Sequence, residues 1–251
     1  MQNHADALEA SVERLRALVH ELDPRQIVAP AYPSEWTVAD VLSHIGSGAV
    51  ILERRLDDTL GGSTTPPDFA ESVWGAWNAM PPQAQAADAL LADQSLLHRL
   101  GSLSDEERAR FQFAMGPMTF DLAGFVGLRL NEHALHTWDI QVAFDPDATV
   151  APASTRIVID DLQMIVRFAG RPTGTEHQVT VQTTEPRRDF TVTLGAEAVT
   201  LTPAGPAEEP DLEIPAEAFV RLVYGRLDPD HAPAVHGSAH LDELRRAFPG
   251  A

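Results

Sequence analysis

Cysteine and lysine are both absent from this chain of 251 residues. Without cysteine the protein has no disulfide, no thiolate metal ligand and no cysteine nucleophile, so thiol chemistry needs a thiol supplied from outside. The 18 basic residues are all arginine, a bias that we attribute to a GC-rich coding sequence rather than to function.

Positive charge is scarce, and the formal net charge is -19. A surface this acidic repels phosphate backbones and anionic membranes, so we expect no nucleic acid and no membrane among the partners. Long hydrophobic runs are missing too, because nowhere do about 18 apolar residues follow one another. The first residues have neither a basic region nor an apolar run. We therefore expect a soluble, cytoplasmic protein.

The first part of the chain has the apolar periodicity of helices. Spacings of three and four residues predict long helices over about 5–22, 37–59, 82–100 and 119–144. The segment 66–82 carries Phe69, Trp74 and Trp77 and is expected to be a long loop, either a lid over a site or a poorly packed flap. This part of the sequence predicts a helical bundle.

The pattern changes at about residues 146–152. A helix is expected over 153–169, and segments rich in Val and Thr that alternate with period two predict strands over 177–184, 189–194, 198–201 and 211–214. A helix over 215–224 and then a last strand and helix are expected to end the chain. The expected fold class is α+β, with a helical bundle over 1–149 and a smaller α+β domain over 150–251.

The segment 131–139 carries the clearest chemical signal. Glu132 and His136 lie four residues apart in an apolar stretch, so on a helix they share one face and can close on a single metal ion. A third candidate ligand, His44, lies in the amphipathic segment 36–45, on a helix that can pack alongside. Two His and one Glu leave an open position on a tetrahedral ion, as in catalytic zinc sites.

These residues also have ordinary structural interpretations. A lone His44 on a half-apolar helix is often a hydrogen-bonded core residue, and Glu132 and His136 could form a solvated pair. His133 points about 100° away from Glu132 around the helix and is interpreted as a surface or packing residue. Both interpretations of the three candidate ligands stay open on spacing alone.

Two acidic residues lie one helical turn from the histidines. Asp40 precedes His44 and Asp139 follows His136, so each could orient a ligand imidazole from the second coordination shell. For Asp40, a carboxylate in the first turn of a helix is an equal alternative, because the helix dipole favours it there.

Three parts of the sequence together resemble the mycothiol-dependent maleylpyruvate isomerase family. They are Trp-Thr-Val-x-Asp-Val-Leu-x-His at 36–44, Glu-x-x-x-His-x-Trp-Asp at 132–139 and the α+β tail. The resemblance covers nearly the whole chain and implies a DinB-like four-helix bundle followed by a sterol-carrier-like domain. It also implies a divalent metal, usually Zn²⁺, held by His44, Glu132 and His136, with mycothiol as the thiol cosubstrate.

The resemblance extends to one arginine of the tail. Family members tend to end a tail helix with a Gly-Arg pair, here Gly225-Arg226, and Arg226 is thereby implied to act at the metal cleft by binding a carboxylate. Its alternative role is to stabilise a helix dipole. Arg129 is a second possible anion contact, or the partner of an acidic neighbour.

Histidines are also frequent near the end of the chain. His231, His236 and His240 are interpreted as exposed loop residues, because their spacing around Pro233 and Gly237 does not favour a second metal site.

The implied chemistry uses a low-molecular-weight thiol and a small-molecule electrophile. A zinc-activated mycothiol thiolate would attack the electrophile, giving cis-trans isomerisation of a maleylpyruvate-like acid or, without elimination, S-transfer. The alternatives are a metal-dependent hydrolase without thiol, whose general base would be Asp139 or His133, and a non-catalytic ligand-binding or regulatory member of the family.

Overall fold

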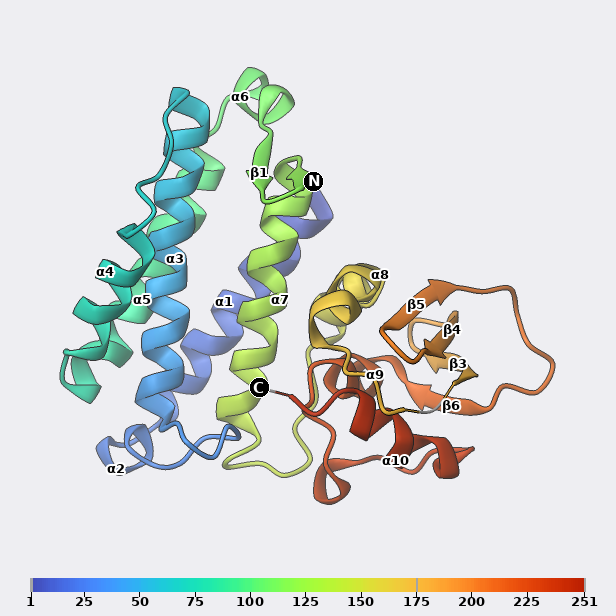
Figure 1. Ribbon diagram of the computed structural model, residues 1–251. Helices are drawn as coiled ribbons and strands as arrows, with labels where there is room; N and C mark the ends of the chain where they lie inside the picture. The colour runs from blue at the N-terminus through green and yellow to red at the C-terminus, as the bar shows by residue number, and fades with distance from the viewer. Residues whose placement is uncertain (1, 175, 251) are drawn as a thin grey trace. The chain divides into compact units, whose positions relative to one another are not determined.

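The computed structural model describes residues 2–174 and 176–250 and divides the chain into two compact units, Met1–Ala148 and Thr149–Ala251 (Figure 1). The elements of the first unit are α1 (Gln2–Glu21), α2 (Pro24–Ile27), α3 (Val38–Gly61), α4 (Phe69–Asn78), α5 (Pro82–Gly101), α6 (Asp105–Arg110), β1 (Phe113–Met115), β2 (Met118–Phe120) and α7 (Leu122–Gln141). None of the described helices is long and apolar enough to cross a membrane.

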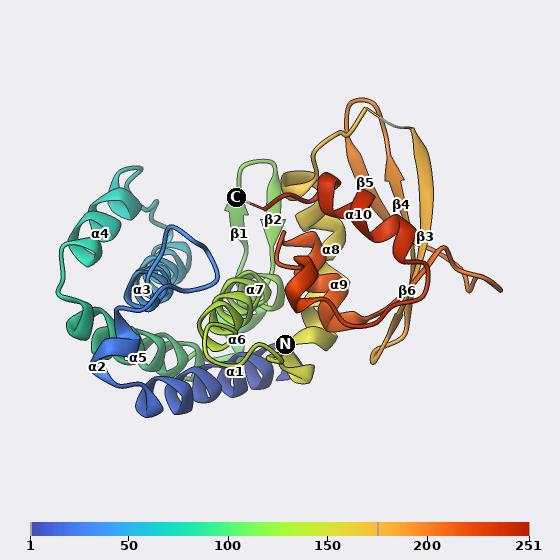
Figure 2. The same cartoon turned by 90° about the horizontal axis from the view of Figure 1, so that it is seen from below.

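The four long helices α1, α3, α5 and α7 form the bundle of the first unit. Helix α3 packs against α5, α4 and α7, and α7 also packs against α1; Figure 2 views α3 and α7 nearly along their axes. Apolar side chains that recur on the inner faces fill the core, among them Leu8, Leu15, Leu42, Ile45 and Leu96.

Local sequence explains where α3 begins and ends. The Thr37 side chain accepts a hydrogen bond from the Asp40 amide, and the Asp40 carboxylate accepts one from the Thr37 amide, so the two residues form a capping box. The helix stops at Gly62, whose φ of 71° is a left-handed conformation that glycine adopts without strain. These signals fix the two ends of the helix that carries His44.

The prediction of a loop over 66–82 is wrong, because most of this segment forms helix α4. Trp77 on this helix is buried against Gly46 of α3, where a side chain on residue 46 would collide with the indole ring. Tertiary packing of an aromatic residue therefore holds a short helix that its own periodicity does not reveal. The β1–β2 hairpin, with Phe113 paired to Phe120, was not predicted either.

The second unit is built on one mixed sheet. Its elements are α8 (Pro152–Ala169), β3 (His177–Thr184), β4 (Arg188–Leu194), β5 (Val199–Pro203), β6 (Leu212–Pro215), α9 (Ala216–Val223), a 3-10 turn (Pro229–His231) and α10 (Ser238–Ala247). The strand order is β5-β4-β3-β6, with β6 parallel to β3 and the other pairs antiparallel. Helix α8 packs on β5 and α9 on β3, both on one side of the sheet in Figure 2.

The α+β fold class is confirmed, but the last strand is wrong. Between α9 and α10 the described residues contain no strand, only an isolated bridge in which His236 exchanges two backbone hydrogen bonds with Glu213. Pro229, Pro233 and Gly237 interrupt this stretch, and a proline cannot donate to a strand ladder.

Candidate metal centre

The three candidate ligands of the first unit converge in the structure. His44 comes from α3 and Glu132 and His136 come from α7, and one ligand atom of each lies within 4.8 Å of the other two. The Glu132 Oε2 atom is 3.2 Å from His44 Nε2 and 3.6 Å from His136 Nε2. The arrangement therefore presents two imidazole nitrogens and one carboxylate oxygen to a common point.

Asp139 determines which nitrogen of His136 faces that point. Its buried carboxylate accepts a hydrogen bond from His136 Nδ1 at 2.8 Å, so a neutral His136 carries its proton on Nδ1. The His136 Nε2 lone pair then faces the Glu132 carboxylate, and two electron-rich atoms at this distance need a proton or a cation between them. A divalent metal satisfies this requirement.

The charge of Glu132 is stabilised by the same neighbours. Loss of hydration disfavours its ionisation, but hydrogen bonds from His136 and His44 and the charges of the two imidazoles outweigh this, so the pKa of Glu132 lies below its ordinary value. The Glu132 side chain is nevertheless 52% exposed, so the cluster is open to an incoming ligand.

Trp36 covers the two imidazoles. Its ring is stacked with that of His136 at a centroid distance of 5.9 Å and lies 5.4 Å from that of His44. The indole restricts the orientation of both rings, which suits ligands that must point at one ion.

The second acidic residue considered from the sequence has a different role. The exposed Asp40 carboxylate accepts hydrogen bonds from the amide and hydroxyl of Thr37, at 2.8 and 2.6 Å, and has no hydrogen bond to His44 among the described residues. Asp40 thus caps α3, which was the alternative interpretation.

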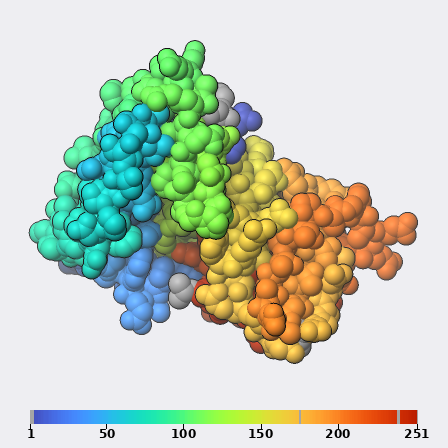
Figure 3. Space-filling view, turned by 45° about the horizontal axis from the view of Figure 1, so that its top comes forward, coloured from blue at the N-terminus to red at the C-terminus, as the bar shows by residue number. Residues whose placement is uncertain are grey.

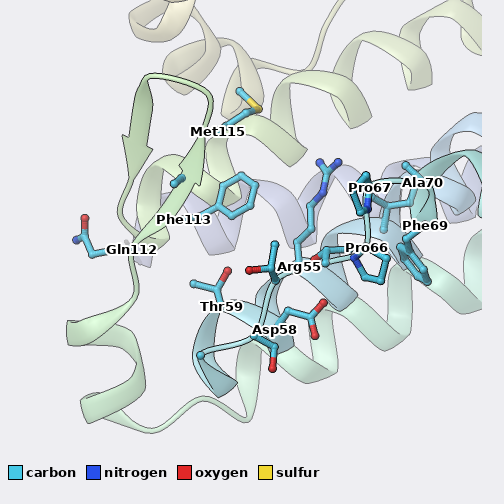
Figure 4. Close-up of a pocket in the computed structure, with 16 residues that line it drawn as sticks. Arg55, Asp58, Thr59, Pro66, Pro67, Phe69, Ala70, Gln112, Phe113 and Met115 are labelled. Carbon is cyan, nitrogen blue, oxygen red and sulfur yellow. The ribbon is translucent and has the colours of Figure 1, made fainter.

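A cavity of about 390 Å³ opens beside His44, with Ser47 of α3 and Trp74 and Asn78 of α4 in its wall. A second cavity, of about 580 Å³, lies further along the same side of α3 (Figure 4). Its walls are formed by the C-terminal part of α3, by the residues that follow α3 and by residues 112–115, most of which belong to β1. These parts of the chain lie side by side in Figure 3. Helix α4 contributes to both cavities.

Arg55 gives the second cavity a positive charge. Positions 44, 51 and 55 are seven and eleven residues apart, so His44, Ile51 and Arg55 share one side of α3. The Arg55 side chain extends between Phe113 and Pro67 in Figure 4 and has no hydrogen bond or ion pair among the described residues. It is available to an anionic ligand group, and side chains on a helix lean toward the N-terminus, here toward His44.

The family model of the mycothiol maleylpyruvate isomerase N-terminal domain matches residues 8–141, more than half of the chain. This chain belongs to that family. The matched segment contains all three converging candidate ligands.

Two solved structures of the family have the same fold. The match to a crystal structure of the mycothiol-dependent maleylpyruvate isomerase covers 90% of this chain and 89% of the isomerase chain, with a TM-score of 0.65 and 14% sequence identity. The match to a crystal structure of a histidine-to-alanine mutant of that enzyme covers 93% of this chain and 92% of the mutant chain, with a TM-score of 0.66 and 13% sequence identity. No curated protein matches the chain.

The sequence did not reveal a buried polar network behind the ligands. Asp93 of α5 binds Arg129 Nη2 at 2.5 Å and His133 Nε2 at 3.1 Å, and Ser11 of α1 bonds to His133 Nδ1 at 2.8 Å. Burial opposes ionisation of Asp93, but Arg129 and His133 lower its pKa to about 2. A lone Asp on an otherwise ordinary helix gave no signal of this role.

The network corrects two expectations. His133 is fully buried, so its interpretation as a surface residue is wrong and its packing role is right. Arg129 is 3% exposed and bound to Asp93 and the Ile45 carbonyl, so it is not an anion contact at the cleft. Its acidic partner is distant in sequence, on another helix.

Arg226 belongs to the second unit. It follows Gly225, whose φ is 68°, and its Nη1 donates to the Tyr224 carbonyl at 3.0 Å. Its role in substrate binding stays a prediction from the family resemblance.

Proposed function

We propose that this family member is a thiol-dependent metalloenzyme whose divalent metal, zinc in the first place, is held by His44, Glu132 and His136. The observation that carries the proposal is the convergence of their three donor atoms, with Asp139 fixing the tautomer of His136. Two imidazoles and one carboxylate suit zinc and leave it an open position. When bound, the metal would lower the pKa of a coordinated thiol, so that the thiol is a nucleophile near neutral pH.

The chain's own residues have distinct parts in this proposal. With no cysteine in the chain, the thiol comes from outside, and family membership favours mycothiol. Trp36 holds the two imidazoles in place on the solvent side. Arg55 binds an anionic group of the electrophile or the thiol, which matters in a protein with a net charge of -19.

The proposed electrophile is a small acid such as maleylpyruvate. Addition of the thiol followed by elimination makes the protein an isomerase, and addition alone makes it an S-transferase. The geometry disfavours the hydrolase alternative, because the Asp139 carboxylate is buried and bound to His136, and His133 faces Asp93 in the core. Neither is placed to take a proton from a water in the cleft.

Turnover by the full chain loaded with zinc tests the proposal. Maleylpyruvate and a neutral electrophile are each offered with mycothiol, with another small thiol and with no thiol. We expect product only when mycothiol is present, and the product, trans isomer or thioether, identifies the reaction. Glu132→Gln should abolish turnover, whereas Glu9→Gln on the exposed face of α1 should not. A hydrolysis product formed equally well without thiol would favour the hydrolase, and ligand binding without any product would favour the non-catalytic alternative.

A further inference from the structure

We infer that the second unit has a metal site of its own, formed by His177, His240 and Glu243. One ligand atom of each lies within 4.8 Å of the other two. His177 Nε2 is 3.0 Å from Glu243 Oε2, and the rings of His177 and His240 are 6.2 Å apart. The site is independent of the proposed function, because all three residues lie outside the matched N-terminal domain.

The backbone explains how these residues meet. His240 and Glu243 are three residues apart on α10 and therefore share a face of that helix. His177 is the first residue of β3, where its pairing with Leu194 fixes its position in the sheet. Helix α10 packs on β6, the parallel neighbour of β3. Sheet pairing and helix packing thus bring together donors that are 63 residues apart in the sequence.

A simple ion pair does not account for the whole cluster. His177 and Glu243 satisfy each other, but the His240 ring makes no hydrogen bond among the described residues although its nitrogen lies close to both. The carboxylate of Asp211, which accepts hydrogen bonds from the amide and hydroxyl of Thr180, is near enough to interact electrostatically with both histidines. A cation shared by the three ligands would give the free imidazole a partner in an acidic setting.

The donor set selects the class of metal. Two imidazoles and one carboxylate favour Zn²⁺ and similar transition-metal ions over Mg²⁺ and Ca²⁺, which prefer oxygen ligands. The three residues are only partly buried, so the ion can reach them from solvent and keep a water ligand. Because the ligands come from β3 and α10, a bound ion would join the last helix to the sheet and stabilise the folded second unit.

The other histidines near the end of the chain are not part of this site. His231 Nδ1 bonds to Asp228 at 2.9 Å, and His236 is exposed with its backbone paired to Glu213. His240, by contrast, lies on α10 and not in a loop as expected. Its neighbour His177 is on a distant strand, so the local spacing could not show that the two meet.

The test measures Zn²⁺ binding to the full chain in which His44→Ala and His136→Ala remove the first centre. Titration calorimetry should show one zinc ion per chain, and zinc should raise the melting temperature. Adding His240→Ala or His177→Ala should abolish both effects. His236→Ala, a nearby exposed histidine, is the matched control and should leave them unchanged.

The chain carrying His44→Ala and His136→Ala could misfold, so the same substitutions are also made in the otherwise unchanged chain. There, His240→Ala should reduce bound zinc by one ion while thiol-dependent turnover continues. Zinc binding that is unchanged by both His240→Ala and His177→Ala would overturn the inference, and so would a folded background variant that binds no zinc. If the unchanged chain shows no thiol-dependent turnover but still loses one zinc ion on His240→Ala, the proposed function is contradicted and this second site is not.

Discussion

The buried carboxylate of Asp139 sets the tautomer of His136, one of the proposed metal ligands. Asp139 holds the Nδ1 proton of His136, so the Nε2 lone pair is the donor that would bind a metal. We expect Asp139→Asn to weaken zinc binding at the first centre by about 10- to 100-fold, because an amide neither fixes this tautomer nor raises the basicity of the ring. Competition with a chromophoric chelator measures the affinity.

Asp40 offers the matched control for this change. Its carboxylate caps α3, so Asp40→Asn should cost at most about 1 kcal/mol of stability and leave the zinc affinity as it is. Equal affinities in the Asp139→Asn variant and the parent protein would show that Asp139 does not orient the ligand.

Asp93 is the residue on which the buried network depends. It neutralises Arg129, which is 3% exposed, so Asp93→Asn would leave a buried guanidinium without a counter-charge. We expect this substitution to lower the free energy of unfolding by about 3–5 kcal/mol in urea denaturation. Asp57→Asn, which breaks the exposed pair with Arg99, should cost less than about 1 kcal/mol. Similar costs for the two variants would contradict a special role for the network.

The same residue gives the stability a defined pH dependence. Asp93 has a pKa of about 2 in the folded protein, below the value of about 3.9 for an unfolded chain. The ionised Asp93 carboxylate therefore contributes fully to the free energy of unfolding above about pH 4, and this contribution, roughly 2–3 kcal/mol, is lost as the pH falls toward about 2. Acid titration of chelator-treated protein should show this loss, and Asp93→Asn should show a flatter profile over that interval.

At the scale of elements, the contact between α3 and α4 rests on the absence of a side chain. A Cβ atom on Gly46 would collide with the Trp77 ring and come within 2.9 Å of the Ala89 Cα of α5. We expect Gly46→Ala to destabilise the first unit by about 1–3 kcal/mol in thermal or urea denaturation. Gly75→Ala has open space around the new methyl group and should be neutral or stabilising by up to about 1 kcal/mol. A neutral Gly46→Ala would show that Trp77 can move away.

Helical periodicity was sufficient to predict the long helices and, with the two family-like segments, the three candidate ligands whose donor atoms converge. It could not predict α4, because Trp77 is held by a residue of another helix. The same limit applies to His133, whose partners Ser11 and Asp93 lie on α1 and α5. Spacing along one helix gives the direction of a side chain but not what it meets there.

For the whole molecule, the net charge of -19 sets a long-range field that an anionic substrate must cross. Raising the salt from about 0.01 M to about 0.15 M shortens the Debye length from about 30 Å to about 8 Å. We expect the KM for a dianionic electrophile to fall over this range, while the KM for a neutral electrophile stays constant. Steady-state kinetics with both substrates measures the difference. A KM for the dianion that does not respond to salt would mean that local cations such as Arg55 dominate.

The α+β organisation followed from the change of periodicity near residue 150, and the solved family structures have the same fold. The cluster of His177, His240 and Glu243 did not follow, because it depends on the packing of α10 on the sheet. Long-range contacts of this kind have no local sequence pattern.

The proposed chemistry depends on one divalent metal ion held by His44, Glu132 and His136. Its most direct test is elemental analysis of the purified full chain carrying His240→Ala, which removes the second proposed site, with and without His44→Ala. We expect about one zinc ion per chain in the first protein and a near-complete loss of zinc in the second. Equal zinc content in the two proteins would contradict it.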